Sequence, residues 1–356
     1  MRSVINLRIL EKEFSQLSES AYFDEDFREF VIRSTGAIRH VLSELDHYPV
    51  AVVKGFELHL WNARKFIKGT RSSDAPYEVQ FALRAALNDW IPGQVLLSYA
   101  ALEDMSFFLN LTDLWKFING SLDRFDTEGY SPLVVRIGTP DVFKHRPTFC
   151  TPLFHELGHF IDIQAKVSEL SMLLDPPALP DGMTSTQHAR LMQTHQFHRM
   201  EHFADIFAAC YCGDALNHTL GYIAKDNPAS DTHPATSDRI ELVSDFLQGT
   251  DKPITALLKK AFKIRTGGEL EPKYSVPEIS NFFDDVLTYP IGSKRELFGL
   301  FQASWRYLEA QLDKPTAPWI EAQTSEFIIE KTVNDLTEKS LRNYEVRERW
   351  SNVPSL

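Results

Sequence analysis

The segment His155-Glu-Leu-Gly-His159 combines residue types and a spacing that can bind a metal ion and activate a water molecule on it. Residues four apart lie on one face of a helix, so both imidazoles can reach a single Zn²⁺ ion. Glu156 projects beside them, where its carboxylate can take a proton from a water molecule that the metal acidifies. The pattern predicts a zinc hydrolase site with His155 and His159 as metal ligands and Glu156 as general base.

A catalytic zinc site needs a third protein ligand. The extended pattern H-E-x-x-H-x-x-G-x-x-H is excluded, because Asp162 and Ala165 stand where its glycine and third histidine would be. We expect Glu201, in the segment Glu201-His-Phe-Ala-Asp205, to be the third ligand. Asp205 lies one helical turn further on, and we expect it to accept a hydrogen bond from the second nitrogen of a ligand histidine.

The same segment is rich in histidine, with His188, His195, His198 and His202. His198 is the alternative third ligand, with His202 after it. The other interpretation is that these histidines are surface residues or face the substrate.

A third segment, His233-Pro-Ala-Thr-Ser-Asp-Arg239, carries two more candidates. His233 placed over the metal can donate a hydrogen bond to the oxyanion of a tetrahedral intermediate. Arg239 can bridge to Asp205 or Glu201 and hold the ligand helix in place. The alternative is a helix N-terminus with a polar cap.

Two helices must position these groups. Thr151-Pro152 is typical of a helix start, and we expect this helix to run to about Leu174. Gly158 is unfavourable inside a helix, so we expect it to allow the close approach of another backbone. The second helix is expected over 185–213.

Two short strands are expected near these helices, at 94–100 and 131–138. The second is rich in β-branched residues, and Pro132 indicates that it is an edge strand. Residues 106–119 are aromatic-rich and are expected to be helical.

The rest of the chain is expected to be helical. Residues 1–92 contain amphipathic spacing, and 236–350 predict about five helices, with long ones at 294–313 and 317–349. The fold class is therefore mainly α with a small β-sheet (α+β). We divide the chain into a helical N-terminal region (1–92), a catalytic core (93–249) and a helical C-terminal region (250–356).

The composition restricts the class of partner. The chain has 356 residues and a net charge of −12, which argues against nucleic acid or an anionic membrane as partner. No stretch approaches the roughly 20 apolar residues of a membrane span. Three cysteines, Cys150, Cys210 and Cys212, do not make a disulfide framework, and we expect the C-x-C pair to be buried small residues. We expect a soluble, cytoplasmic protein.

Together the three segments resemble the gluzincin metallopeptidases, in particular the HtpX-like and CAAX-prenyl-protease-type family, over residues 130–245. That family's pattern is H-E-x-x-H, then E-x-x-x-D, then H-P-x-x-x-x-R. The familiar members carry membrane-spanning helices. The E-x-x-A-D-x-F-A piece is also similar to the soluble ImmA/IrrE-type metallopeptidases.

The resemblance implies a zincin-like core around the motifs. It implies zinc binding by His155, His159 and Glu201, general-base catalysis by Glu156, and support of the site by His233 and Arg239. It also implies that the strand binds substrate backbone by β-augmentation. The residues expected to do so are Val134, Val135, Arg136, Ile137 and Gly138.

The sequence thus favours a zinc-dependent metallopeptidase that acts on a restricted set of protein or peptide substrates. One alternative is an inactive helical interaction protein with a structural metal site. Another is a metal-dependent amidase that acts on a small molecule. The oligomeric state stays open.

Overall fold

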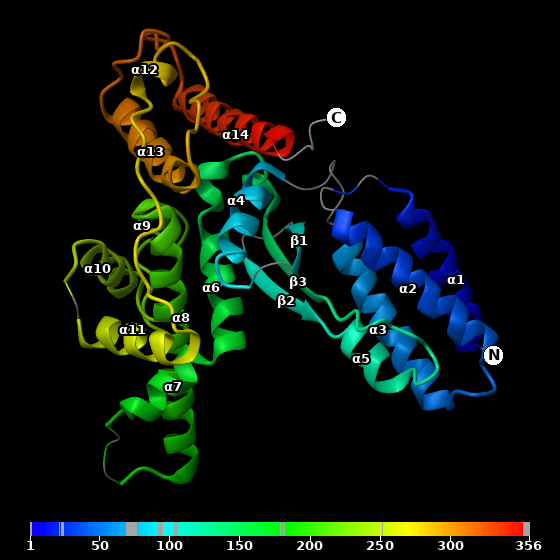
Figure 1. The fold of residues 1–356 in the computed structure, drawn as a ribbon. Helices are drawn as coiled ribbons and strands as arrows, with labels where there is room; N and C mark the ends of the chain where they lie inside the picture. The colour runs from blue at the N-terminus through cyan, green and yellow to red at the C-terminus, as the bar shows by residue number, and fades with distance from the viewer. Residues whose placement is uncertain are drawn as a thin grey trace. The chain divides into compact units, whose positions relative to one another are not determined.

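The computed structural model describes residues 2–20, 22, 25–68, 77–91, 95–102, 106–178, 180, 182–250 and 252–351. The described chain is mainly helical with one small three-stranded sheet, which confirms the expected α+β class (Figure 1). None of its helices combines the length and the apolar character needed to cross a membrane.

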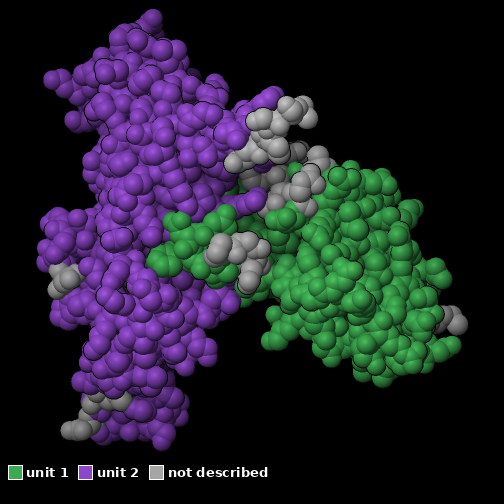
Figure 2. All heavy atoms as spheres, in the orientation of Figure 1, with its two compact units in different colours: residues 1–80, 87–141 green, residues 81–86, 142–356 purple. Residues whose placement is uncertain are grey.

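The chain forms two compact units, one of residues 1–80 and 87–141 and the other of 81–86 and 142–356 (Figure 2). This division differs from the sequence-based regions 1–92, 93–249 and 250–356. The sheet belongs to the same unit as the N-terminal helices, and the C-terminal helices belong to the unit that carries the predicted metal ligands.

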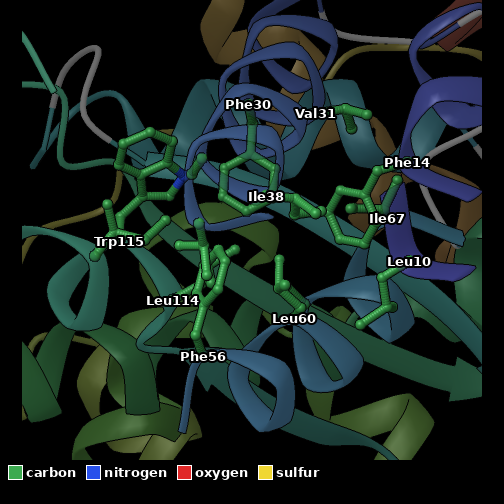
Figure 3. Packing of buried hydrophobic residues seen from close by; sticks show 14 of the residues in the cluster. Leu10, Phe14, Phe30, Val31, Ile38, Phe56, Leu60, Ile67, Leu114 and Trp115 are labelled. Atoms are coloured by element: carbon green, nitrogen blue, oxygen red, sulfur yellow. The ribbon is translucent and has the colours of Figure 1, made fainter. Parts of the chain in front are cut away.

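Helices of the first unit enclose an apolar core (Figure 3). They are α1 (Arg2–Ser18), α2 (Glu25–Ser43), α3 (Val50–Lys68) and α5 (Leu114–Ser121), and α4 (Tyr77–Leu87) has residues in both units. On α3, Phe56, Leu60 and Ile67 follow the amphipathic spacing and are fully buried. The rings of Phe30 and Trp115 meet edge to face with centroids 6.5 Å apart.

The sheet contains β1 (Val95–Leu102), β2 (Phe108–Thr112) and β3 (Leu133–Pro140) in the order β1-β3-β2. Strand β3 pairs in parallel with β1 and antiparallel with β2, so it is the central strand. The prediction of an edge strand at 131–138 was therefore wrong. Pro132 stands one residue before β3, where its missing N–H removes no bond from the ladder.

This correction removes the reason for assigning substrate binding to the strand. Residues 134–138 pair with β1 on one side and β2 on the other, so neither side of β3 is free to add a further strand. The helix expected at 106–119 is also partly wrong. Its first half is β2, whose Leu111 pairs with Val135, and the helix α5 begins only at Leu114.

The second unit is built from helices. They are η1 (Asp141–Phe143, which begins at the boundary), η2 (Pro147–Cys150), α6 (Pro152–Ala165), α7 (Val167–Leu174), α8 (Ser185–Cys212), α9 (Ala215–Ile223), α10 (Thr236–Leu247), α11 (Pro253–Thr266), α12 (Ser280–Phe283), α13 (Lys294–Asp313) and α14 (Glu326–Ser351). The expected helices at 185–213 and 294–313 are confirmed. The last helix begins at Glu326 rather than near 317.

The helix expected from Pro152 to Leu174 is broken into α6 and α7. Lys166 adopts a left-handed conformation with φ of 54°, which ends α6. The Asp162 carboxylate then accepts hydrogen bonds from the Ser168 backbone N–H (2.8 Å) and the Ser168 hydroxyl (2.6 Å). These bonds give the free backbone N–H of the first turn of α7 an acceptor. The chain can therefore turn here although no glycine or proline marks the break.

Helix α13 packs against α8 in the second unit. Phe154 of α6 lies between Tyr211 of α8 and Phe301 of α13, with ring centroids 6.0 Å and 5.4 Å away. The Trp305 indole N–H donates to the Thr148 carbonyl at 2.6 Å. The C-terminal region therefore braces the two helices that carry the predicted ligands.

All three cysteines are buried and free. Burial raises the pKa of the Cys150 and Cys210 thiols to about 12 and raises that of Cys212 as well. The Cys212 thiol donates to the Ala208 carbonyl at 3.2 Å within α8. The prediction that the C-x-C pair consists of buried small residues is confirmed.

We expect none of the three thiols to react with a disulfide reagent such as DTNB in the folded protein at pH 8. Each thiol is both inaccessible and protonated, and the thiolate is the reacting form. In guanidinium chloride all three should react within seconds. Rapid reaction of even one thiol in the folded protein would contradict this burial.

Candidate metal centre

The site depends on close packing between α6 and α8, which lie side by side in Figure 1. A Cβ atom added at Gly158 would stand only 2.8 Å from the Cα of Ala204 and 3.1 Å from the Cβ of Phe207. The expectation that Gly158 allows another backbone to approach is therefore confirmed. This approach brings His155 and His159 of α6 against Glu201 of α8.

The structure brings the three predicted ligands together. The possible ligand atoms of His155, His159 and Glu201 all lie within 4.8 Å of one another. The two Nε2 atoms face the carboxylate, at 3.4 Å from Oε2 for His155 and 3.2 Å from Oε1 for His159. The side chains are mostly buried, with exposed fractions of 8% for His155, 17% for His159 and 8% for Glu201.

Asp205 and Arg239 orient the first histidine. His155 Nδ1 lies 2.8 Å from Asp205 Oδ1, and because a carboxylate only accepts, Nδ1 donates. The Nε2 atom of His155 is thereby directed at Glu201. Arg239 grips the same carboxylate with two bonds, Nε to Oδ2 at 2.8 Å and Nη2 to Oδ1 at 2.7 Å.

The charges of the site are balanced within it. Burial would raise the pKa of Glu201, but its contacts with His155 and His159 outweigh burial and hold that pKa well below its usual range. Burial would also raise the pKa of Asp205, but Arg239 and then His155 keep that pKa low. Burial lowers the pKa of His155, but the two carboxylates raise it to about 9. A metal ion entering this site would replace a proton as the compensating charge.

The residues present fit a metal ion. Glu201 Oε2 is buried and has no well-formed hydrogen bond within the described chain; its nearest partners are His155 Nε2 at 3.4 Å and Arg239 Nη2 at 3.5 Å. Both contacts are longer than an ordinary hydrogen bond, so a cation bound at this oxygen would satisfy the buried carboxylate better. Two imidazoles and one carboxylate form a three-ligand set that leaves a further coordination position open.

The two predicted catalytic residues also lie at this group. Glu156 is half-buried on α6 beside His155. Burial lowers the pKa of Arg239, but the charges of Asp205, then Glu201 and then Glu156 outweigh it and raise that pKa. His233 lies on the connection between α9 and α10, with 56% of its side chain exposed. Its Nε2 is 3.6 Å from Glu201 Oε1.

The alternative ligands lie elsewhere. His198 Nε2 is 2.8 Å from the Ser230 carbonyl, which can only accept, so this nitrogen donates and holds no lone pair for a metal. His202 is mostly buried next to Glu201 and is not part of the ligand group. His188 is exposed and His195 is half-buried. No sequence pattern indicates the bond from His198 to Ser230, because its acceptor is a backbone atom 32 residues away.

Comparison with known proteins adds no further assignment. No model of a known protein family matches the chain, and neither curated proteins nor solved structures give a match. The geometry of the second unit therefore carries the functional argument.

We expect Glu201→Ala to weaken Zn²⁺ binding by more than about a hundredfold, because residues that only support a ligand cost about ten- to a hundredfold. The measurement is competition for Zn²⁺ against a chromophoric chelator, with circular dichroism as a check of folding. His198→Ala is the matched control and should bind Zn²⁺ like the wild type. Full binding by Glu201→Ala would show that this carboxylate is not a ligand.

We expect Gly158→Ala to destabilise the protein by about 1–3 kcal/mol, since the added methyl group has no room against the α8 backbone. Zn²⁺ affinity should fall with it, because the ligands lie on both helices. Gly221→Ala on α9 is the control, as nothing lies within 4 Å of the added Cβ. Urea unfolding and chelator competition measure the two effects, and equal stability of both variants would refute the close-packing argument.

Proposed function

We propose that this protein is a zinc-dependent metallopeptidase with a zincin-like site, acting on a restricted set of protein or peptide substrates. The observation that carries this proposal is the buried group of His155, His159 and Glu201 with Glu156 beside it. Two imidazoles and a carboxylate are a ligand set that suits zinc. The order of the three motifs, which resembles that of the gluzincins, supports the same conclusion.

Zinc held by these ligands supplies a Lewis acid that acidifies water and polarises a carbonyl group. The other steps belong to residues of this chain. Glu156 accepts the proton of the attacking water and delivers it to the nitrogen of the leaving amine, so its carboxylate ends the cycle ionised. Its place between two ligands on α6 keeps it next to the reacting carbon.

His233 is placed to stabilise the oxygen of the substrate carbonyl. Its Nδ1 lies 2.8 Å from the Thr232 hydroxyl, and its Nε2 faces the ionised Glu201. When Nδ1 accepts a hydrogen bond from the Thr232 hydroxyl, the ring proton of the neutral imidazole is on Nε2. Nε2 can then donate to the oxygen as negative charge develops on it.

Two other functions account less well for the site. A structural zinc site takes four protein ligands. Three ligands meet here in the described chain, and the fourth candidate, His198, donates to Ser230 instead. A small-molecule amidase would use the same chemistry as a peptidase. Since β3 is a central strand, the choice of a peptide substrate rests on the resemblance of the motifs.

We expect Glu156→Gln to keep Zn²⁺ affinity within about threefold and to lower hydrolysis by at least about a hundredfold, because the amide cannot take a proton. Zinc-loaded wild type and variant would be incubated with a peptide library, and products followed by mass spectrometry. A panel of small amides runs in parallel. Equal activity of the two proteins would remove Glu156 from the mechanism, and hydrolysis of small amides alone would favour the amidase.

A further inference from the structure

The segment that carries His233 is a closed turn. We call residues 225–235 the His233 loop; it connects α9 to α10. At its base the Thr236 N–H donates to the Asn227 carbonyl at 3.0 Å. At its tip the Ser230 N–H donates to the His233 carbonyl at 2.8 Å, and the His233 N–H donates to the Ser230 hydroxyl at 3.0 Å. These bonds make the tip from Ser230 to His233 one structural unit.

Two side chains of α8 fasten this tip from outside. His198 Nε2 donates to the Ser230 carbonyl at 2.8 Å. Arg190 Nε donates to Asp231 Oδ2 at 3.0 Å, in a pair whose side chains are 73% and 59% exposed. Both contacts are exposed, but the His198 bond ends on the backbone of the tip, whereas Arg190 reaches it only through the exposed side chain of Asp231. We therefore take His198 as the principal tether and Arg190 as the auxiliary one.

Both tethers lie on the helical stripe that carries the site. At about 100° per residue, Arg190, His198, Glu201 and Asp205 fall within about 80° of the circumference of α8. Because α8 is continuous from Ser185 to Cys212, this stripe fixes the distance between the tethers and the ligand Glu201. One rigid element thus sets the position of His233 relative to the metal site.

We propose that His198 and Arg190 are positioning residues, which clamp the tip of the His233 loop onto α8 and so hold His233 Nε2 over Glu201. This inference deepens the proposed function, on which it rests for the catalytic role of His233. Although the next residue, Pro234, is buried, the His233 ring is 56% exposed, so its position depends on how the tip of the loop is held. A displacement of about 1 Å at a reacting group can cost about a hundredfold in rate.

The hydrogen bond from His198 to the Ser230 carbonyl determines which substitutions test this proposal. The Ser230 carbonyl accepts only, so residue 198 must present an N–H donor at the reach of Nε2. His198→Gln retains such a donor, and His198→Ala removes it. Arg190→Ala removes the auxiliary tether. His188→Ala is the matched control, because it deletes an exposed histidine of the same helix.

The test is histidine NMR on the zinc-loaded full chain, labelled with ¹⁵N in histidine, with the His233 signal assigned by its absence in His233→Asn. In the wild type we expect a His233 ring signal shifted away from that of free histidine. In His198→Ala it should move to the averaged position of a mobile ring, and in Arg190→Ala part of the way. His198→Gln should restore the wild-type signal, and His188→Ala should leave it unchanged.

Zn²⁺ affinity, measured on the same variants, separates positioning from ligation. It should stay within about threefold of wild type throughout, since His155, His159 and Glu201 are untouched. An unchanged His233 signal in His198→Ala overturns the inference. So does a loss of Zn²⁺ affinity as large as that of Glu201→Ala, which would place His198 at the metal.

These readouts need no substrate, so they separate the inference from the proposed function. If the wild type hydrolyses no peptide, the proposed function fails while the NMR result still decides whether His198 positions His233. If it does hydrolyse peptides, His198→Ala should lower kcat about ten- to a hundredfold with KM nearly unchanged, and His198→Gln should restore it. An effect on KM alone would overturn the positioning role.

Discussion

The buried carboxylate of Asp205 is the point on which the second unit's site depends. It is fully buried, and it is bound by His155 from α6 and by Arg239 from α10, while Asp205 itself lies on α8. An ionised carboxylate in this position is costly unless charged donors satisfy both oxygens. The same contacts therefore join three helices, fix the orientation of His155 and keep α10 next to the candidate ligands.

Glu201 lies one turn before Asp205. Unlike Asp205, it has no short hydrogen bonds from Arg239. Arg239 reaches one of its oxygens only at 3.5 Å, and no hydrogen bond within the described chain satisfies Oε2. Arg239 thus binds mainly to Asp205, and the Glu201 carboxylate faces the imidazoles of His155, His159 and His233. This asymmetry distinguishes a residue that can bind a metal from one that orients a ligand, although both are buried acids on the same face of α8.

The sequence predicted which candidate ligands come together better than it predicted the fold around them. His155 and His159, like Glu201 and Asp205, are related by one helical turn, so their common face follows from local geometry. The central position of β3 depends on pairing with two distant strands, which no local pattern records. The left-handed Lys166 depends on Asp162 capping the next helix. The hydrogen bond from His198 ends on a backbone carbonyl. Because every residue type has one, no sequence pattern marks this acceptor.

The exposed fractions of the site residues show from which side it is accessible. They rise from 8% at His155 and Glu201 to 17% at His159 and 56% at His233. The closed side is formed by the buried Asp205 and Arg239 and by the close contact of the two helices at Gly158. The open side is bounded by His233 and its loop, which the N-terminal half of α8 holds in place. Under the proposed function, the residues that face a substrate are therefore expected along this loop and this part of α8, and not along β3, which has no free edge.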